Sequence, residues 1–217
     1  MRTVLVSVLL IGLSGHATGD GVNKSSAQPW TPDSWSAAVQ AMPRGAATRG
    51  EKLATEGYCI TCHGDKGVSP SRNSPSLAGQ DPVFIYKALL DFKSGLWHID
   101  NKSTGMYAVT QPLTKQDMAD LAAFYAAQNR SKQGSTSTAS PSSGPAACLP
   151  CHPTNGSADP GHTGPILDGQ STYYLKRQLT AFKTRKRNTD VSGVMESMTQ
   201  TLSNKQREEL IQFFSGQ

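Results

Sequence analysis

The chain has 217 residues, of which 36% are hydrophobic and 7% aromatic, and its formal net charge is +5 at pH 7. This length allows one medium-sized domain or two small ones, and a small domain buries only a thin core of its own. Nucleic acid is not expected as a partner, because the chain begins with an export leader. We interpret one cluster of basic residues as a solvated face or a docking surface for an acidic partner: Lys183, Arg185, Lys186 and Arg187.

Residues 1–19 have the pattern of a cleaved signal peptide. Arg2 precedes a short apolar run, and the small residues that follow it suit cleavage after Ala17 or Gly19. The run of about ten residues is too short to cross a bilayer, which takes about 20. The leader therefore predicts a periplasmic protein with at most peripheral membrane contact. A buried N-terminal helix and an uncleaved anchor are the weaker interpretations.

Residues 20–43 form a polar N-terminal extension that carries two tryptophans. Asp33 or Ser34 can cap a short helix that runs through Ala41, and Pro43 would end it. Two interpretations stay open. The extension is either an arm that covers the first domain or a segment that binds a partner.

The first predicted domain, residues 44–130, opens with a helix over Arg44–Gly57 whose small residues form a stripe. Gly50 lies on this stripe and would let another helix approach closely. The motif Cys59-Ile-Thr-Cys62-His63 follows directly. Two cysteines spaced three apart lie on one face of a helical turn, and the next residue can bring its imidazole over whatever they hold.

This motif is typical of covalent c-type haem attachment. Thioether bonds from Cys59 and Cys62 would hold the porphyrin, and His63 would be one axial ligand of the iron. The motif returns 89 positions later as Cys148-Leu-Pro-Cys151-His152. The sequence therefore predicts two covalently bound haem c groups, one for each half of the chain.

Two other uses of the cysteines stay open. The two C-x-x-C pairs could supply four thiolates to one structural zinc ion, or a single pair could be a redox dithiol. A zinc ribbon usually closes within a shorter span, however, and here a histidine follows both pairs. All four cysteines lie in the two motifs, so none is left for a disulfide.

Helices and loops alternate through the rest of the first half. Apolar spacing predicts a helix over Pro82–Lys93, and a loop is expected over Leu96–Thr110. Thr114 then caps an amphipathic helix that runs to about Asn129, with Asp117 placed as its capping-box partner. Residues 131–145 are rich in Ser, Thr, Gly, Pro and Ala, and they predict a flexible linker.

Residues 146–217 repeat the first half at an offset of 89 or 90 positions. For example, Pro75-Ser-Leu-Ala-Gly-Gln80 corresponds to Pro165-Ile-Leu-Asp-Gly-Gln170. Such an internal duplication predicts a second domain of the same kind. Each proline also stands where its carbonyl oxygen could accept a hydrogen bond from the histidine of its own motif, which would fix the tautomer and the ring orientation.

Two methionines are candidates for the sixth iron ligand. Met106 and Met195 each lie 47 residues after the first cysteine of their own motif. A thioether sulfur is soft, and it stabilises ferrous iron. Met198 is the rival in the second half, and His98 or His162 could replace a methionine. Both methionines could also be simple core residues.

The combination of C-x-x-C-H, P-x-L-x-G-Q, an F-K pair, a methionine and a final L-T or L-S helix, used twice over about residues 44–217, resembles the dihaem cytochrome c4 family. The resemblance implies an all-α protein of two class I cytochrome c domains related by a pseudo-twofold axis. It implies His63 and Met106 as ligands of the first iron, and His152 and Met195 as ligands of the second. Family members carry electrons in the periplasm, commonly toward a terminal oxidase.

The sequence departs from the family pattern in two places. Only small residues and proline precede Cys148, so the second domain is expected to lack its N-terminal helix. The helix predicted over Asn204–Phe214 would then need other cover, from the polar extension or from a partner. Where relatives often have an arginine after the F-K pair, the first half has Trp97, whereas the second half keeps Arg187.

The motifs favour an electron carrier over an enzyme. Its partners would be redox proteins, such as an upstream reductase or dehydrogenase and a terminal oxidase. A dihaem peroxidase or a thiosulfate-type dehydrogenase would need an open, histidine-ligated or cysteine-ligated iron, and no cysteine is spare. The other alternative is the cytochrome subunit of a larger oxidoreductase, such as a flavin-dependent sulfide dehydrogenase, docked through the extension or the second domain.

Overall fold

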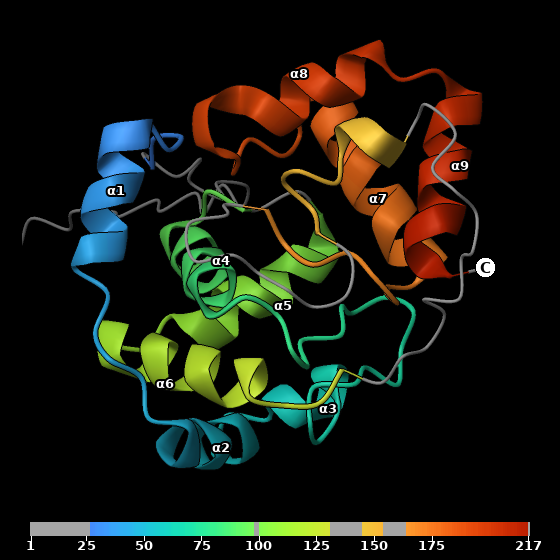
Figure 1. The fold of residues 1–217 in the computed structure, drawn as a ribbon. Coiled ribbons are helices and arrows are strands. Elements are labelled where there is room, and N and C mark those ends of the chain that lie inside the picture. Colours follow the sequence, from blue (N-terminus) through green and yellow to red (C-terminus); the bar gives the residue numbers. More distant parts are fainter. Residues whose placement is uncertain (1–26, 98–99, 131–144, 154–163, 217) are drawn as a thin grey trace, which may run out of the picture.

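The computed structural model describes residues 27–97, 100–130, 145–153 and 164–216, which contain helices and no β-strand (Figure 1). The predicted all-α class is confirmed. Within these ranges, no helix combines the length and the apolar character that crossing a bilayer requires. The predicted signal peptide, residues 1–19, and nearly all of the predicted linker, 131–145, lie outside the described residues. The proposed domain boundaries, 44–130 and 146–217, stay predictions.

The elements follow one another in the order that the duplication predicts. The extension contains α1 (Pro32–Gln40). The first half contains α2 (Ala47–Glu56), α3 (Cys59–His63), α4 (Pro82–Ser94), α5 (Asn101–Thr110) and α6 (Lys115–Ala126). The second half contains the 3-10 turn η1 (Pro145–Ala147), α7 (Thr172–Lys183), the 3-10 turn η2 (Val191–Gly193), α8 (Val194–Thr201) and α9 (Asn204–Ser215).

Helix α2 crosses α6 at close range because a glycine lies at the contact. A Cβ atom on Gly50 would lie 2.0 Å from the Asp120 carbonyl oxygen and 2.7 Å from the Cβ of Phe124. Arg49 ties the same helices together by pairing with both Asp117 and Asp120. The prediction that Gly50 permits a close helix approach is confirmed.

The predicted ends of α4 and α6 are close to those observed. Asp81 caps α4 by accepting a hydrogen bond from the Phe84 amide at 2.6 Å, and Gly95 ends the helix with φ 78°. The predicted capping box of α6 is confirmed: the Thr114 hydroxyl accepts from the Asp117 amide at 3.1 Å, and the Asp117 carboxylate accepts from the Thr114 amide at 2.8 Å. Helix α6 ends at Ala126, three residues before the predicted end.

The loop predicted over Leu96–Thr110 is wrong from Asn101 onward, where α5 begins. A reciprocal pair of hydrogen bonds, each 3.0 Å long, starts this helix: Asp100 N–H donates to Ser103 Oγ, and Ser103 N–H donates to Asp100 Oδ1. The segment has no apolar stripe that would reveal a helical period. Packing against α4 stabilises it instead.

The second half is built on α7, which packs against α8 and α9. In the described part of the second half only η1 precedes Cys148. Residues 131–144 lie outside the described residues, so the expected loss of the N-terminal helix stays a prediction. Leu210 and Phe214 of α9 are nevertheless 4% exposed each, because α7 and the Cys148 segment cover them. The described part of the polar extension, residues 27–43, does not belong to this core: it contacts α4 and η2 instead.

The extension lies against both halves of the molecule (Figure 1). Its helix begins two or three residues earlier than predicted, because Thr31 rather than Asp33 or Ser34 is the cap, and Pro32 suits the first helical position. Trp30 donates its indole N–H to Asp91 of α4 at 2.5 Å, and its carbonyl accepts from the Ser192 amide in η2 at 3.0 Å. The interpretation as a packed arm is therefore confirmed, although the arm covers more than the first half.

Candidate functional site

The first motif forms α3, a single helical turn held between two residues with positive φ. Tyr58 precedes it with φ 58°, and Gly64 ends it with φ 81°. A Cβ on Gly64 would lie 1.9 Å from the Val68 carbonyl oxygen, so the chain can turn there only without a side chain. Cys59 is partly buried and Cys62 is exposed, which places the two thiols at the edge of the first core.

His63 is buried and oriented by the backbone. Its Nδ1–H donates to the Pro75 carbonyl oxygen at 2.9 Å, as the sequence predicts. Burial lowers the pKa of His63, which favours the neutral ring. Because Nδ1 carries the proton, the lone pair is on Nε2, and this nitrogen is free to bind a metal.

The second motif repeats this arrangement in a turn rather than an α-helix. The His152 amide donates to the Cys148 carbonyl at 2.8 Å, and His152 Nδ1–H donates to the Pro165 carbonyl at 2.8 Å. Burial lowers the pKa of His152 as well. A Cβ on Gly164 would lie 2.1 Å from the Cys151 carbonyl oxygen. The sequence analysis missed this glycine, because the equivalent residue in the first half is a serine.

The candidate methionines occupy equivalent helices. Met106 lies on α5, is partly buried and packs against the core of the first half. Met195 lies in the first turn of α8, where Asp190 Oδ2 accepts from its amide at 2.7 Å. Met195 is partly buried, whereas Met198 is 40% exposed, so burial favours Met195. The rivals His98 and His162 lie outside the described residues.

The four cysteines do not form one zinc site. All four are described, and the described part of the chain contains no group of three or more His, Cys, Asp or Glu side chains placed to hold a metal ion. The interpretation that both C-x-x-C pairs bind one structural zinc ion is therefore wrong. Cys59 packs against the core of the first half and Cys148 against the core of the second, whereas Cys62 and Cys151 are exposed.

The basic cluster of the second half is not a solvated face throughout. Arg187 is 7% exposed, and its guanidinium lies 3.5 Å from the centre of the Trp97 ring of the first half. It also donates to Thr189 and Gln178. Burial lowers the pKa of Arg187 to about 10, which leaves it charged at neutral pH. The two positions that distinguish the halves by sequence are thus in contact, and the interpretation of Arg187 as a surface residue is wrong.

A buried ion pair lies beside this contact. Lys87 and Asp91 of α4 are joined at 2.7 Å, with side chains 6% and 2% exposed, and Lys87 also donates to the Thr189 carbonyl of the second half. Burial raises the pKa of Asp91 and lowers the pKa of Lys87. The junction between the halves is therefore polar, buried and closely paired.

The described residues fit a haem at each motif. Each motif provides two thiols and one buried, neutral imidazole with a free Nε2. Buried polar atoms without a hydrogen-bond partner in the described residues also occur in both halves: Tyr125 Oη in the core that contains Cys59, and Arg177 Nε and Nη1 with Asp190 Oδ1 in the second half. Such atoms are uncommon in folded proteins, and a further polar group bound nearby would satisfy them.

Comparison with known proteins agrees with these features. The family model described as cytochrome C oxidase, cbb3-type, subunit III matches residues 45–124. A cytochrome c4 of Stutzerimonas stutzeri is 31% identical over 240 aligned positions, which cover 100% of this chain and 99% of that protein. The chain belongs to the cytochrome c4 family. It is accordingly a c-type cytochrome of electron transport.

Two further comparisons place this cytochrome c4 family member among its relatives. The crystal structure of reduced recombinant cytochrome c4 from Pseudomonas stutzeri superposes with a TM-score of 0.66 at 29% identity, covering 79% of this chain and 98% of that one. A protein named thiosulfate dehydrogenase electron acceptor, from Thiomonas intermedia, is 27% identical over 73% of this chain and 78% of that protein.

Proposed function

We propose that this protein is a periplasmic dihaem cytochrome that carries single electrons between redox partner proteins. Cys59 and Cys62 would hold one haem c, and Cys148 and Cys151 would hold the other. The axial pairs would be His63 with Met106 and His152 with Met195. The observation that carries this proposal is that both motif histidines are buried, neutral and fixed by a proline carbonyl, at 2.9 and 2.8 Å.

The chain's own residues would set the conditions for electron transfer. Haem, when bound, supplies an iron that accepts and releases one electron. The main-chain bonds to His63 and His152 hold each ring in one tautomer, so the ligand does not have to reorganise when the charge changes. A partly buried thioether, from Met106 or Met195, would favour the ferrous state.

Mass spectrometry of the mature protein and a spectroelectrochemical titration test this proposal. We expect two covalent haem additions, cleavage of residues 1–19, and a ferric methionine-to-iron charge-transfer band that disappears in step with reduction of both haems. Met106→His and Met195→His should each remove about half of the band, whereas Met198→His should leave it unchanged. A high-spin haem, or one without the band in the native protein, would contradict the assigned ligands.

A second candidate function is the cytochrome subunit of a larger oxidoreductase. The relative named thiosulfate dehydrogenase electron acceptor favours it. A sulfur-compound dehydrogenase would then be the electron donor, and a terminal oxidase would remain a suitable acceptor. Gel filtration of native extract separates the two functions: a stable, co-eluting dehydrogenase indicates a subunit, whereas elution as a small single protein indicates a free carrier.

A further inference from the structure

Two buried glutamines, Gln80 and Gln170, end the two P-x-L-x-G-Q motifs, and each reaches into the opposite half. Gln80 Oε1 accepts from the Ile166 amide at 2.8 Å, and its Nε2 donates to the Ile166 carbonyl at 2.9 Å. Gln170 makes the same pair of bonds with Ser76, at 3.0 and 2.7 Å. Both glutamines are 4% exposed. Each amide thus satisfies both backbone groups of one residue across the junction.

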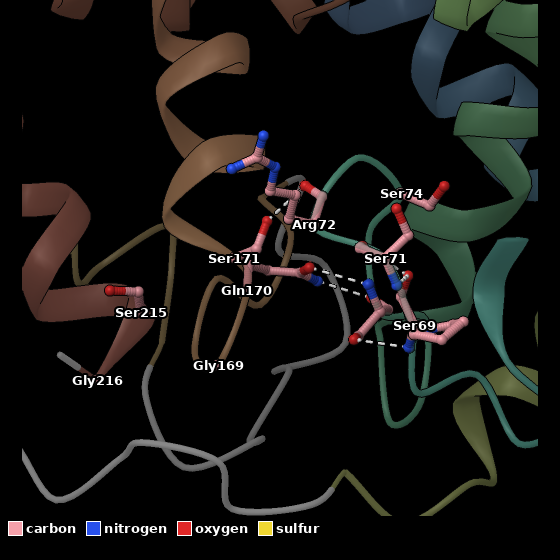
Figure 2. A pocket seen from close by; sticks show the side chains of 11 residues that line it. Ser69, Ser71, Arg72, Ser74, Gly169, Gln170, Ser171, Ser215 and Gly216 are labelled. Atoms are coloured by element: carbon pink, nitrogen blue, oxygen red, sulfur yellow. Dashed lines mark hydrogen bonds between the residues drawn. The ribbon is translucent and has the colours of Figure 1, made fainter.

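Figure 2 shows one of these contacts. Gln170 lies two residues before α7, and its side chain points toward the loop that carries Ser69 and Ser71. The Ser171 hydroxyl adds a third bond to the same loop, donating to the Arg72 carbonyl at 2.7 Å. A pocket of about 430 Å³ opens beside this contact and is lined mainly by small polar residues.

The residue that each glutamine holds directly follows the proline that orients a histidine. The Ser76 N–H and the Pro75 C=O belong to one peptide group, which donates to Gln170 through nitrogen and accepts from His63 through oxygen. The equivalent peptide group of Pro165 and Ile166 donates to Gln80 and accepts from His152. Each histidine is therefore connected, through one peptide group, to a glutamine of the other half.

Hydrogen bonds that share a peptide group strengthen one another. Donation through the N–H polarises the group and makes its oxygen a better acceptor. A better acceptor at Nδ1–H raises the basicity of the ring, and a more basic ligand stabilises the ferric state of a bound iron. Loss of the glutamine bond should therefore weaken the histidine bond without any direct contact with the ring.

We propose that Gln80 and Gln170 are positioning residues, each of which strengthens the hydrogen bond on the motif histidine of the opposite half and so lowers the reduction potential there. This proposal rests on the proposed function, because it needs an iron at each histidine. Gln170 acts on His63, and Gln80 acts on His152. The electron affinity of each half then depends on correct docking of the other half.

The first test is nuclear magnetic resonance of the ferrous holoprotein with ¹⁵N-labelled histidine. We expect Gln170→Met to move the Nδ1–H proton resonance of His63 upfield and to leave that of His152 in place. Gln80→Met should do the reverse. Gln128→Met is the matched control, because Gln128 donates only within its own region, to the Phe124 carbonyl at 2.8 Å. It should move neither resonance.

The second test is a redox titration of the same variants, with the two haems followed separately by their methyl resonances. Each glutamine variant should raise the potential of the haem in the opposite half. If the glutamines only held the two halves together, each variant would loosen the whole junction and shift the potentials of both haems. An equal shift of both potentials, a shift in the variant's own half, or no shift at all would overturn the proposal.

Gln170→Glu keeps the proposal testable even if Gln80→Met and Gln170→Met do not fold. A carboxylate oxygen can still accept from the Ser76 amide, so the His63 Nδ1–H resonance should stay at least as far downfield as in the native protein. An upfield position would overturn the proposal. If the native protein lacks two methionine-ligated haems, the proposed function fails. If it has them but each glutamine variant does not act on the opposite half, only the proposed role of the glutamines fails.

Discussion

At the scale of single residues, each motif histidine is held by a main-chain oxygen rather than by a carboxylate. The Pro75 and Pro165 carbonyls do not change protonation state over the pH range in which proteins are folded, so they hold the neutral rings of His63 and His152 in the same tautomer. Burial lowers the pKa of both rings, so it also favours the neutral form that can bind a metal. Each histidine is therefore ready to bind a metal, whichever residue provides the ligand on the other side of that metal.

The contact at Gly50 gives a prediction at this scale. Gly50→Ala should lower the free energy of unfolding by about 2 kcal/mol, because the new Cβ would lie 2.0 Å from the Asp120 carbonyl oxygen and force α2 away from α6. Urea denaturation measures the change. Gly105→Ala is the matched control: its Cβ would meet nothing within 4 Å, so stability should be unchanged or should rise by up to about 1 kcal/mol. Equal effects of the two variants would contradict the expected clash.

At the scale of elements, the N-terminal arm lies outside the duplicated sequence and connects α4 of the first half with η2 of the second half. Trp30 bonds to Asp91 on α4 and to Ser192 in η2, and η2 leads directly into α8, which carries Met195. Trp35 packs edge-on against Trp30, with ring centres 5.4 Å apart. The arm therefore holds the segment before the second candidate methionine against the first half.

Trp30→Phe tests this connection. The variant keeps an aromatic ring near Lys87 but removes the indole N–H that donates to Asp91. Because a buried carboxylate loses a donor, the free energy of unfolding should fall by about 2 kcal/mol, measured by urea denaturation at pH 7. Tyr58→Phe, at a ring that is 78% exposed, should change it by less than about 0.5 kcal/mol. A loss no larger than that of the control would show that the arm bond is not stabilising.

At the scale of the whole molecule, equivalent positions of the duplicated sequence meet across the junction. Trp97 and Arg187 correspond to each other at an offset of 90 and lie in contact. Gln80 binds Ile166 and Gln170 binds Ser76, and these two bonded residues also correspond at an offset of 90. Such reciprocity is what a pseudo-twofold axis through the junction requires. Because the junction is buried and closely paired, the halves should unfold together.

Arg187→Met tests this cooperativity. The variant removes a charge that lies against Trp97 and leaves Gln178 and Thr189 without their partner. We expect a loss of about 3 kcal/mol and separation of the single unfolding transition into two, followed by circular dichroism and by absorption at each haem. Lys186→Met, at an exposed neighbour, should keep one transition and nearly native stability. One native-like transition in the arginine variant would argue against coupling through this contact.

Patterns of sequence were sufficient wherever the physical cause is local. The C-x-x-C-H motifs, the capping box at Thr114, the small-residue stripe around Gly50 and the repeat itself depend on residues close together in the chain or on a regular period. Helix α5 was missed because its apolar residues form no stripe on one face. Helix α8 was also missed, although its apolar residues do lie on one face. Asp100 and Asp190 offered a weak signal, since both accept hydrogen bonds from the first turn of the helix that follows.

By itself, the sequence determined the fold class and indicated the two candidate haem sites, because these follow from motifs and periods. Only the tertiary structure decided that Arg187 is buried against Trp97, that the arm joins both halves, and that Gln80 and Gln170 cross the junction. These contacts join residues that lie between 61 positions (Trp30 and Asp91) and 162 positions (Trp30 and Ser192) apart, and no local pattern records them. Their hydrogen bonds form only when the two halves are docked, since an unpaired buried amide or guanidinium is too costly to keep.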